Sequence, residues 1–424
     1  MEKATKIKEL LNVVFSDPLE GESLIFYVNT LKIRSSDVVS QIGKLKDDCM
    51  FPNSNTNSHL LLGHRGCGKS TELNELIRDL ELKNYPVHKI KCIEEIDIHN
   101  IDRNDILFLI SDSLIKIAKK TNANIPNALS ERIYDFFNKK EIIKEKTKEK
   151  EVSVGGLLSL FVSLKGDIKY GTSKREIIRE EIQNGISDWL SNIKELKDII
   201  YNKEQKLPIL IFEDIDKISK PTEAITIFNN SIFANLQFPV VFTFPISVAF
   251  SSEFMPLKNQ YTVHFLPMIK THTKNNQDFV EGINIIKEII YTRAEKNLFE
   301  DKAVTLLITK TGGCLRDVFE CINKAAFRSY VRNSDIVEKE DIERSLLELK
   351  SDYTRMLVVD DYKKLYEIYQ TKRDIEDKDT SKMLDYLKSQ VVLEYNGEGW
   401  FDVHPLVYDF VDERIKARNA WKPI

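Results

Sequence analysis

The chain has 424 residues, of which 42% are hydrophobic and 30% are charged, and this balance suits about two to three packed soluble domains. A formal net charge of −4 excludes an overall basic field, so nucleic-acid contact would require a local basic patch. Five cysteines without CxxC or Cys/His metal spacing argue against a disulfide framework and indicate reduced thiols. No apolar run reaches the length of a membrane span or fits a signal peptide, so we expect a cytoplasmic protein.

Residues 1–50 contain amphipathic pieces such as "IKELLNVVF" and predict an N-terminal helical segment. The polar link "PNSNTNS" then leads to "HLLL" at 59–62, which predicts the first strand of a core over residues 51–270. Within that core we expect an inserted helical and hairpin region over residues 120–200. A helical lid over 271–349 and a C-terminal domain over 350–424 complete the expected organisation.

The first chemical motif is "GHRGCGKS" at 63–70, which matches the pattern G-x-x-x-x-G-K-[ST] of a phosphate-binding loop in full. The glycines allow a tight turn whose backbone N–H groups point at phosphates, and Lys69, at the surface of this loop, adds a point charge. The Ser70 hydroxyl is expected to ligate Mg²⁺. An apolar helical pattern follows at once, as the motif requires. The predicted nucleotide-binding residues are Gly63, His64, Arg65, Gly66, Cys67, Gly68, Lys69, Ser70 and Thr71.

Residues 152–170, "VSVGGLLSLFVSLKGDIKY", show an alternating pattern in which apolar residues such as Val154, Leu158 and Val162 fall on one parity. This period is typical of strands, and the glycines would supply bends. We therefore expect a β-hairpin here, packed against the domain. The following residues 174–200 predict a long helical stretch.

The apolar run 209–212 in "LPILIFEDIDKI" predicts a buried parallel strand, and three acids follow it: Glu213, Asp214 and Asp216. Such a strand presents carboxylates to Mg²⁺ and to the attacking water. In the usual order Glu213 is the metal-side acid and Asp214 polarises the water. The shorter carboxylate normally comes first, so a register in which Asp214 is on the metal stays open.

Two further residues are sensor candidates. Thr243, in the predicted strand "QFPVVFTFPISVA", would sense the γ-phosphate, although threonine is also simply a good strand former. Arg316 follows the glycine turn of "TGGCLRDVFECINKAAF" and would reach the nucleotide from the lid, or else be an ordinary surface residue of the first helical turn.

After residue 350, helical pieces precede "VVLEYNGEGWFDVHPLV", in which two strand-like runs flank Asn396-Gly397. This is a strong hairpin signal, and helices followed by a hairpin predict a winged-helix-like domain. Its presumed recognition helix carries Lys382 and Lys388 beside Asp385, and the hairpin is acidic at Glu394 and Glu398. We therefore favour a protein contact over DNA.

Taken together, "GHRGCGKST", "ILIFEDID", the Thr243 strand and "GGCLRD" resemble the AAA+/STAND group of P-loop ATPases, with features similar to KAP-type and origin-recognition-type members. The resemblance covers about residues 40–345. It implies an α/β fold with a parallel-sheet P-loop core, a helical lid, and ATP and Mg²⁺ as ligands. Glu213 departs from the aspartate expected at its position, and no secure arginine finger is evident.

The leading functional hypothesis is a slow ATP-hydrolysing regulatory switch that acts through a protein partner, and the resemblance suggests bacterial anti-phage defence or signalling. One alternative is a DNA loader or initiator that grips duplex DNA with the winged helix. Another is a scaffold that holds ATP without hydrolysis. A small-molecule kinase is the least favoured reading, and homo-oligomerisation stays open.

Overall fold

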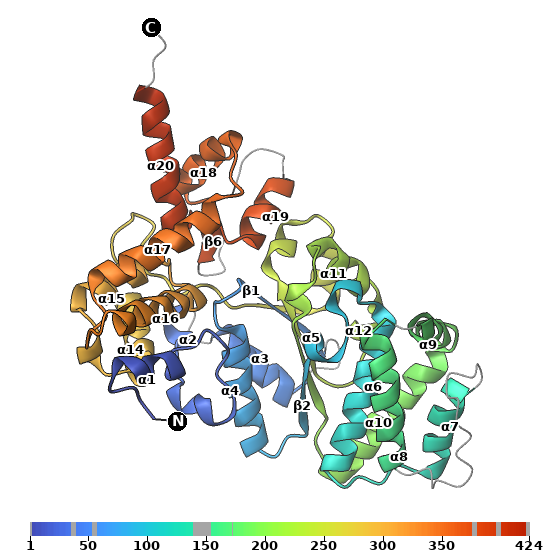
Figure 1. The fold of residues 1–424 in the computed structure, drawn as a ribbon. Helices are drawn as coiled ribbons and strands as arrows, with labels where there is room; N and C mark the ends of the chain where they lie inside the picture. The colour runs from blue at the N-terminus through green and yellow to red at the C-terminus, as the bar shows by residue number, and fades with distance from the viewer. Residues whose placement is uncertain are drawn as a thin grey trace.

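A computed structural model describes residues 2–34, 40–52, 57–138, 154–171, 173–374, 380–395 and 400–420 (Figure 1). Its centre is a sheet of five parallel strands in the order β2-β3-β4-β1-β5, which confirms the expected α/β class. The strands are β1 (Ser58–Gly63), β2 (Val87–Lys91), β3 (Ile209–Glu213), β4 (Val240–Pro245) and β5 (Thr262–Phe265). In the described part of the chain, no helix combines the length and apolarity needed to cross a membrane.

Strands β1, β3 and β4 are buried along their whole length, as continuous apolar runs predict for parallel strands covered on both faces. The register pairs Leu61 with Thr243 and Phe212 with Phe242. Because the carboxyl ends of parallel strands meet at one edge, the loops after β1, β3 and β4 converge there. The helices and turns around this sheet are α3 (Gln41–Met50), α4 (Lys69–Leu82), α5 (Cys92–Glu95), η2 (Ile98–Asn100), η3 (Ile215–Lys217), α11 (Pro221–Phe228), α12 (Ser231–Ala234), η4 (Ile246–Phe250) and α13 (Phe254–Gln260).

In its described residues the inserted region consists of helices and the turns between them, and it packs beside the sheet (Figure 1). Its helices are α6 (Arg103–Lys120), α7 (Asn127–Asn138), α8 (Val154–Lys169), α9 (Ser173–Asn184) and α10 (Ile186–Glu204). Helix α6 forms the centre of this group: Phe108 stacks on Phe161 of α8, with ring centroids 4.8 Å apart.

The prediction of a β-hairpin over residues 152–170 is wrong, because residues 154–169 form helix α8. The buried residues of α8 are Leu157, Leu160, Phe161, Leu164 and Ile168. Apart from the adjacent Leu160 and Phe161, they recur every three or four positions, as on one helix face. The alternating pattern omits the buried residues Leu157 and Phe161 and includes Val162, whose side chain is 61% exposed. The helical period therefore accounts for the burial and the alternation does not.

The lid is a helical unit with its own apolar core, as expected from the sequence. It contains α14 (Val280–Arg293), η5 (Lys296–Leu298), α15 (Asp301–Lys310), α16 (Leu315–Val331) and α17 (Lys339–Thr354). The N-terminal helix α1 (Ile7–Val13) belongs to this core, since Leu10 and Val14 are buried in it, and Figure 1 shows α1 beside α16. The rest of the N-terminal segment, η1 (Gly21–Phe26) and α2 (Leu31–Arg34), leads back from the lid to the sheet.

The C-terminal domain contains helices and a two-stranded antiparallel hairpin, as expected. Its elements are α18 (Val359–Thr371), α19 (Thr380–Lys388), β6 (Val392–Tyr395), β7 (Trp400–Val403) and α20 (Pro405–Ala420). The predicted Asn396-Gly397 turn and Glu398 lie outside the described residues. Strand β6 is buried, and its Leu393 and Tyr395 share a core with residues of β1 and α4. The domain is therefore docked on the core that contains the five-stranded sheet.

Candidate functional site

The glycine loop (residues 63–70) joins β1 to α4 and has a conformation that its glycines permit. Gly66 has φ +73° and Gly68 has φ +102°, values that other residues rarely adopt. Steric contacts also require a glycine at position 66, because a Cβ there would lie 2.8 Å from both the Cβ of Arg316 and the Sγ of Cys314. The Leu315 amide donates to the Gly66 carbonyl at 3.1 Å. The lid therefore rests directly on the glycine loop.

Lys69 is buried, with 6% of its surface exposed, so the expectation of a surface lysine is wrong. Its Nζ lies 2.9 Å from Oδ2 of Asp216 and donates to the carbonyl oxygens of Gly63 at 2.8 Å and His64 at 3.0 Å. Burial lowers the pKa of a lysine, but the Asp216 carboxylate outweighs it and raises the pKa of Lys69 above its ordinary value. Lys69 is thus a charged group held inside the loop.

Asp216 joins the glycine loop to β4, a role that sequence reasoning did not assign to it. Besides its contact with Lys69, its Oδ1 accepts a hydrogen bond from Oγ1 of Thr243 at 3.1 Å. Burial raises the pKa of this carboxyl, but Lys69 and Thr243 together bring its pKa below the ordinary value. Thr243 is therefore linked to Lys69 of the loop through the Asp216 carboxylate. Nothing in the sequence distinguished this third acid from the two before it.

The other two acids after β3 have different surroundings. Asp214 has φ +75°, a conformation in which a non-glycine residue stores strain, and its Oδ1 lies 2.7 Å from Nζ of Lys217. Glu213 is buried, with Oε2 at 2.8 Å from Nζ of Lys89 on β2, and its Oε1 has no hydrogen-bond partner. Asp214 and Asp216 line the cleft described next, whereas Glu213 does not.

A cleft of about 220 Å³ opens beside the glycine loop, with walls from the N-terminal segment, the core and the lid. From the core it is lined by Arg65, Gly66, Gly68, Lys69, Ser70, Thr71, Glu72, Asp214, Asp216 and Lys217. From the other two walls it is lined by Ser16, Asp17, Pro18, Leu19, Phe26, Tyr27, Val28, Thr30, Arg34, Ile289, Arg293, Leu315, Arg316 and Phe319. The predicted residues Arg316, Ser70 and Thr71 therefore share one cleft with Lys69.

Two arginines of this cleft were not predicted. Arg34 of α2 is buried and donates from Nη1 to the carbonyl of Pro267 at 2.6 Å. The guanidinium of Arg293 lies 3.9 Å from the ring centroid of Phe319, and burial lowers its pKa to about 10. Both residues come from segments without a motif, so only the fold reveals their position.

The N-terminal segment forms a wall of the cleft because α4 holds it. Glu72 accepts hydrogen bonds from the Tyr27 hydroxyl at 2.8 Å and the Thr30 hydroxyl at 3.0 Å. The Oγ1 of Thr71 accepts from the backbone N–H of Leu19 at 3.1 Å. These long-range contacts leave no local pattern in the sequence, so the segment was expected only to be helical.

The opposite side of the glycine loop contacts the C-terminal domain. The Nε2 of His64 accepts a hydrogen bond from the backbone N–H of Glu394 in β6 at 2.8 Å, and Nε2 of Gln390 donates to the carbonyl of Arg65 at 2.6 Å. Burial and the nearby Lys69 charge lower the pKa of His64 to about 3, so this imidazole is a neutral acceptor. His64 thus faces the C-terminal domain, and Cys67 is buried in the apolar core.

The donor set of the cleft fits a magnesium nucleotide. Lys69 supplies a charge, Ser70 supplies a hydroxyl, and Asp214 and Asp216 supply carboxylate oxygens, the ligand type that Mg²⁺ prefers. The left-handed backbone at Gly66 and Gly68 is typical of loops whose amides approach phosphate oxygens closely.

The known proteins that resemble this chain are solved structures at low sequence identity. No family model and no curated protein sequence matches it. Solved structures that resemble it include Cdc6p from Pyrobaculum aerophilum (12% identity, TM-score 0.40, 94% of this chain and 99% of that one). They also include the ORC2 protein of Aeropyrum pernix (11%, 0.44, 94% and 98%) and the RuvB Holliday junction branch migration motor of Thermotoga maritima (12%, 0.35, 91% and 99%). At these identities the likeness concerns the fold alone.

Proposed function

We propose that the chain binds and slowly hydrolyses Mg-ATP in the cleft and uses the nucleotide to control its C-terminal domain. The loop amides and Lys69 would hold the phosphates, and Ser70 with the acids after β3 would hold Mg²⁺, which neutralises phosphate charge when bound. The apolar side chains of Leu19, Phe26 and Phe319 line the same cleft and suit a purine base.

The observation that supports the switch is that His64 contacts Lys69 through its carbonyl oxygen and the C-terminal domain through its side chain. Lysine has three N–H donors, and those of Lys69 meet the carbonyls of Gly63 and His64 and the carboxylate of Asp216. To bind a phosphate, Lys69 must release at least one of these partners. Because the His64 side chain also accepts from Glu394, a shift of the loop is transmitted directly to β6.

The contacts of α19 favour this role over DNA loading. Lys388 donates to the carbonyl of Ser219 at 2.6 Å and Lys382 pairs with Asp361 at 3.1 Å, so both lysines of the presumed recognition helix are engaged within the chain. Strand β6 is buried against the core. We expect no salt-sensitive binding to duplex DNA. Nanomolar binding that falls roughly a thousandfold between 50 and 200 mM salt would instead support a loader.

Nucleotide-dependent movement of the C-terminal domain can be measured with spin labels on Lys220→Cys and Lys416→Cys. Both side chains are 75% exposed, and the five native cysteines are buried. Mg-ATP is expected to shift the distance distribution. In a His64→Phe background, which removes the acceptor for Glu394, ATP should still bind but the shift should be lost. An unchanged distribution in the parent at saturating ATP would contradict the switch.

Arg316 is expected to act on ATP rather than ADP. Its side chain lines the cleft from the first turn of α16, so Arg316→Ala should leave ADP affinity nearly unchanged and lower ATP turnover about tenfold or more, as loss of a charged contact implies. The matched control is Arg344→Ala, because Arg344 is 61% exposed on α17 and pairs only locally with Glu340. Equal turnover in both variants would make Arg316 an ordinary helix residue.

A further inference from the structure

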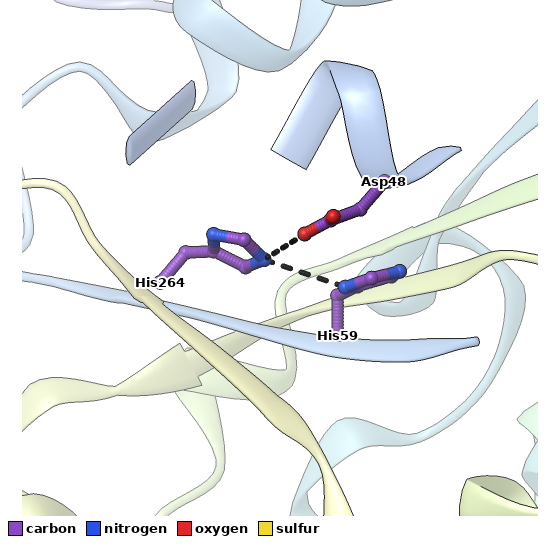
Figure 2. A group of neighbouring side chains, drawn as sticks. All are labelled: Asp48, His59 and His264. Carbon is purple, nitrogen blue, oxygen red and sulfur yellow. Dashed lines mark hydrogen bonds and ion pairs between the residues drawn. The ribbon is translucent and has the colours of Figure 1, made fainter. Parts of the chain in front are cut away.

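Two histidines and an aspartate converge at the edge of the sheet, apart from the nucleotide cleft. Asp48 comes from α3, His59 from β1 and His264 from β5. Figure 2 shows that the two imidazoles and the carboxylate point toward one another. The Nε2 of His264 lies 3.3 Å from Nδ1 of His59 and 3.7 Å from Oδ2 of Asp48, and the three ligand atoms all lie within 4.8 Å of one another.

Burial makes this grouping costly unless it has a ligand. His59 and His264 are 1% and 2% exposed, so both imidazoles are removed from water. A buried polar group without full hydrogen bonding costs free energy. The contact between the imidazoles, at 3.3 Å, is longer than an ordinary hydrogen bond from nitrogen. A direct histidine pair is therefore a poor reason for burying both rings.

The spacing suits a metal ion better. In a tetrahedral zinc site with bonds of about 2.0–2.1 Å, neighbouring ligand atoms lie about 3.3–3.4 Å apart. The two nitrogens already have this separation, whereas the carboxylate oxygen of Asp48 lies 3.7 Å from Nε2 of His264 and within 4.8 Å of the His59 nitrogen, so it must move toward the imidazoles to bind the same ion. Asp48 is 37% exposed, so solvent can reach the open side of the group.

We propose that Asp48, His59 and His264 form a mononuclear site for Zn²⁺ or a similar transition metal, with water as the fourth ligand. Two imidazoles and one carboxylate match the ligand preference of zinc, whereas Mg²⁺ and Ca²⁺ prefer oxygen ligands. The site ties α3 to β1 and to β5, a four-residue strand at the edge of the sheet. Its role is structural, and it is independent of nucleotide binding.

The test uses the full chain after treatment with a chelator. Titration with Zn²⁺ against a chromogenic chelator should show one bound equivalent, and Zn²⁺ should raise the melting temperature. Replacement by Co²⁺ should give the visible absorption of a tetrahedral ion. Asp48→Asn changes a partly exposed ligand and should weaken Zn²⁺ affinity at least tenfold, a loss of the size seen even for the outer partners of metal ligands.

The matched control is Asp47→Asn, which changes the exposed neighbour on α3 and should leave Zn²⁺ affinity unchanged. His264→Gln serves as a second ligand variant, and its circular dichroism reports whether it folds. Lys69→Ala should bind Zn²⁺ as the parent does, because the sites are separate. Absence of a bound equivalent in the folded parent at micromolar Zn²⁺, or equal affinity in the Asp48 and Asp47 variants, would overturn the proposal.

Discussion

Replacement of Lys69 by alanine is expected to abolish Mg-ATP binding measurable by isothermal titration calorimetry. The substitution removes the one cation that the structure places inside the glycine loop, where it is 6% exposed and held by Gly63, His64 and Asp216. Within the low-dielectric loop, the interaction of this charge with a phosphate is screened far less than on the surface. The surface variant Lys220→Ala should bind ATP like the parent.

The same burial means that Lys69→Ala also affects the fold. Removal of one partner of a buried ion pair costs about 3–5 kcal/mol, because the other charge is left uncompensated. Lys69→Met combined with Asp216→Asn removes both charges while keeping similar volumes, so it should melt closer to the parent than Lys69→Ala does. If this folded double variant binds Mg-ATP with the parent affinity, the assignment of the phosphate site is wrong.

The parts of the structure that could be predicted from the sequence depend on local patterns. The glycine loop with its strand and helix, the apolar strand before Glu213 and the hairpin around β6 and β7 all involve residues close together in the chain. In each case a short motif or a continuous apolar run carried enough information. The error over α8 has a local cause too: apolar residues were numerous enough to fit two periods, and only burial distinguishes them.

The missed features depend on contacts between distant residues. Tyr27 and Glu72 are separated by 45 positions and His64 and Glu394 by 330, and no pattern along the chain records such pairs. The pairing of Lys69 with Asp216 likewise needs the register of β1, β4 and β3. For this reason the sequence predicts the motif residues but not the walls of the cleft or the contact between the loop and the C-terminal domain.

The second large effect is expected on ATP turnover, when the acids that follow β3 are substituted. We expect slow turnover in the parent, on the order of 1 per second or less, the bottom of the usual enzyme range. Asp214 lines the cleft in a strained backbone conformation with φ +75°, and its only ion-pair partner among the described residues is Lys217. We therefore propose Asp214 as the acid that polarises the attacking water. Loss of such a group lowers turnover by about 100-fold or more.

Asp214→Asn should therefore keep ATP affinity and nearly stop turnover, as measured by phosphate release and titration calorimetry. Asp352→Asn is the matched control, because Asp352 is 59% exposed on α17 and lies outside the cleft, and it should hydrolyse ATP like the parent. The order of the acids predicts that Glu213 is the acid on the Mg²⁺ side, and Glu213→Gln tests this role. A weaker magnesium dependence of ATP binding would support it, although Glu213 pairs with Lys89. If Glu213→Gln stops turnover and Asp214→Asn weakens magnesium dependence, the two roles are exchanged, and the register in which Asp214 is on the metal is correct.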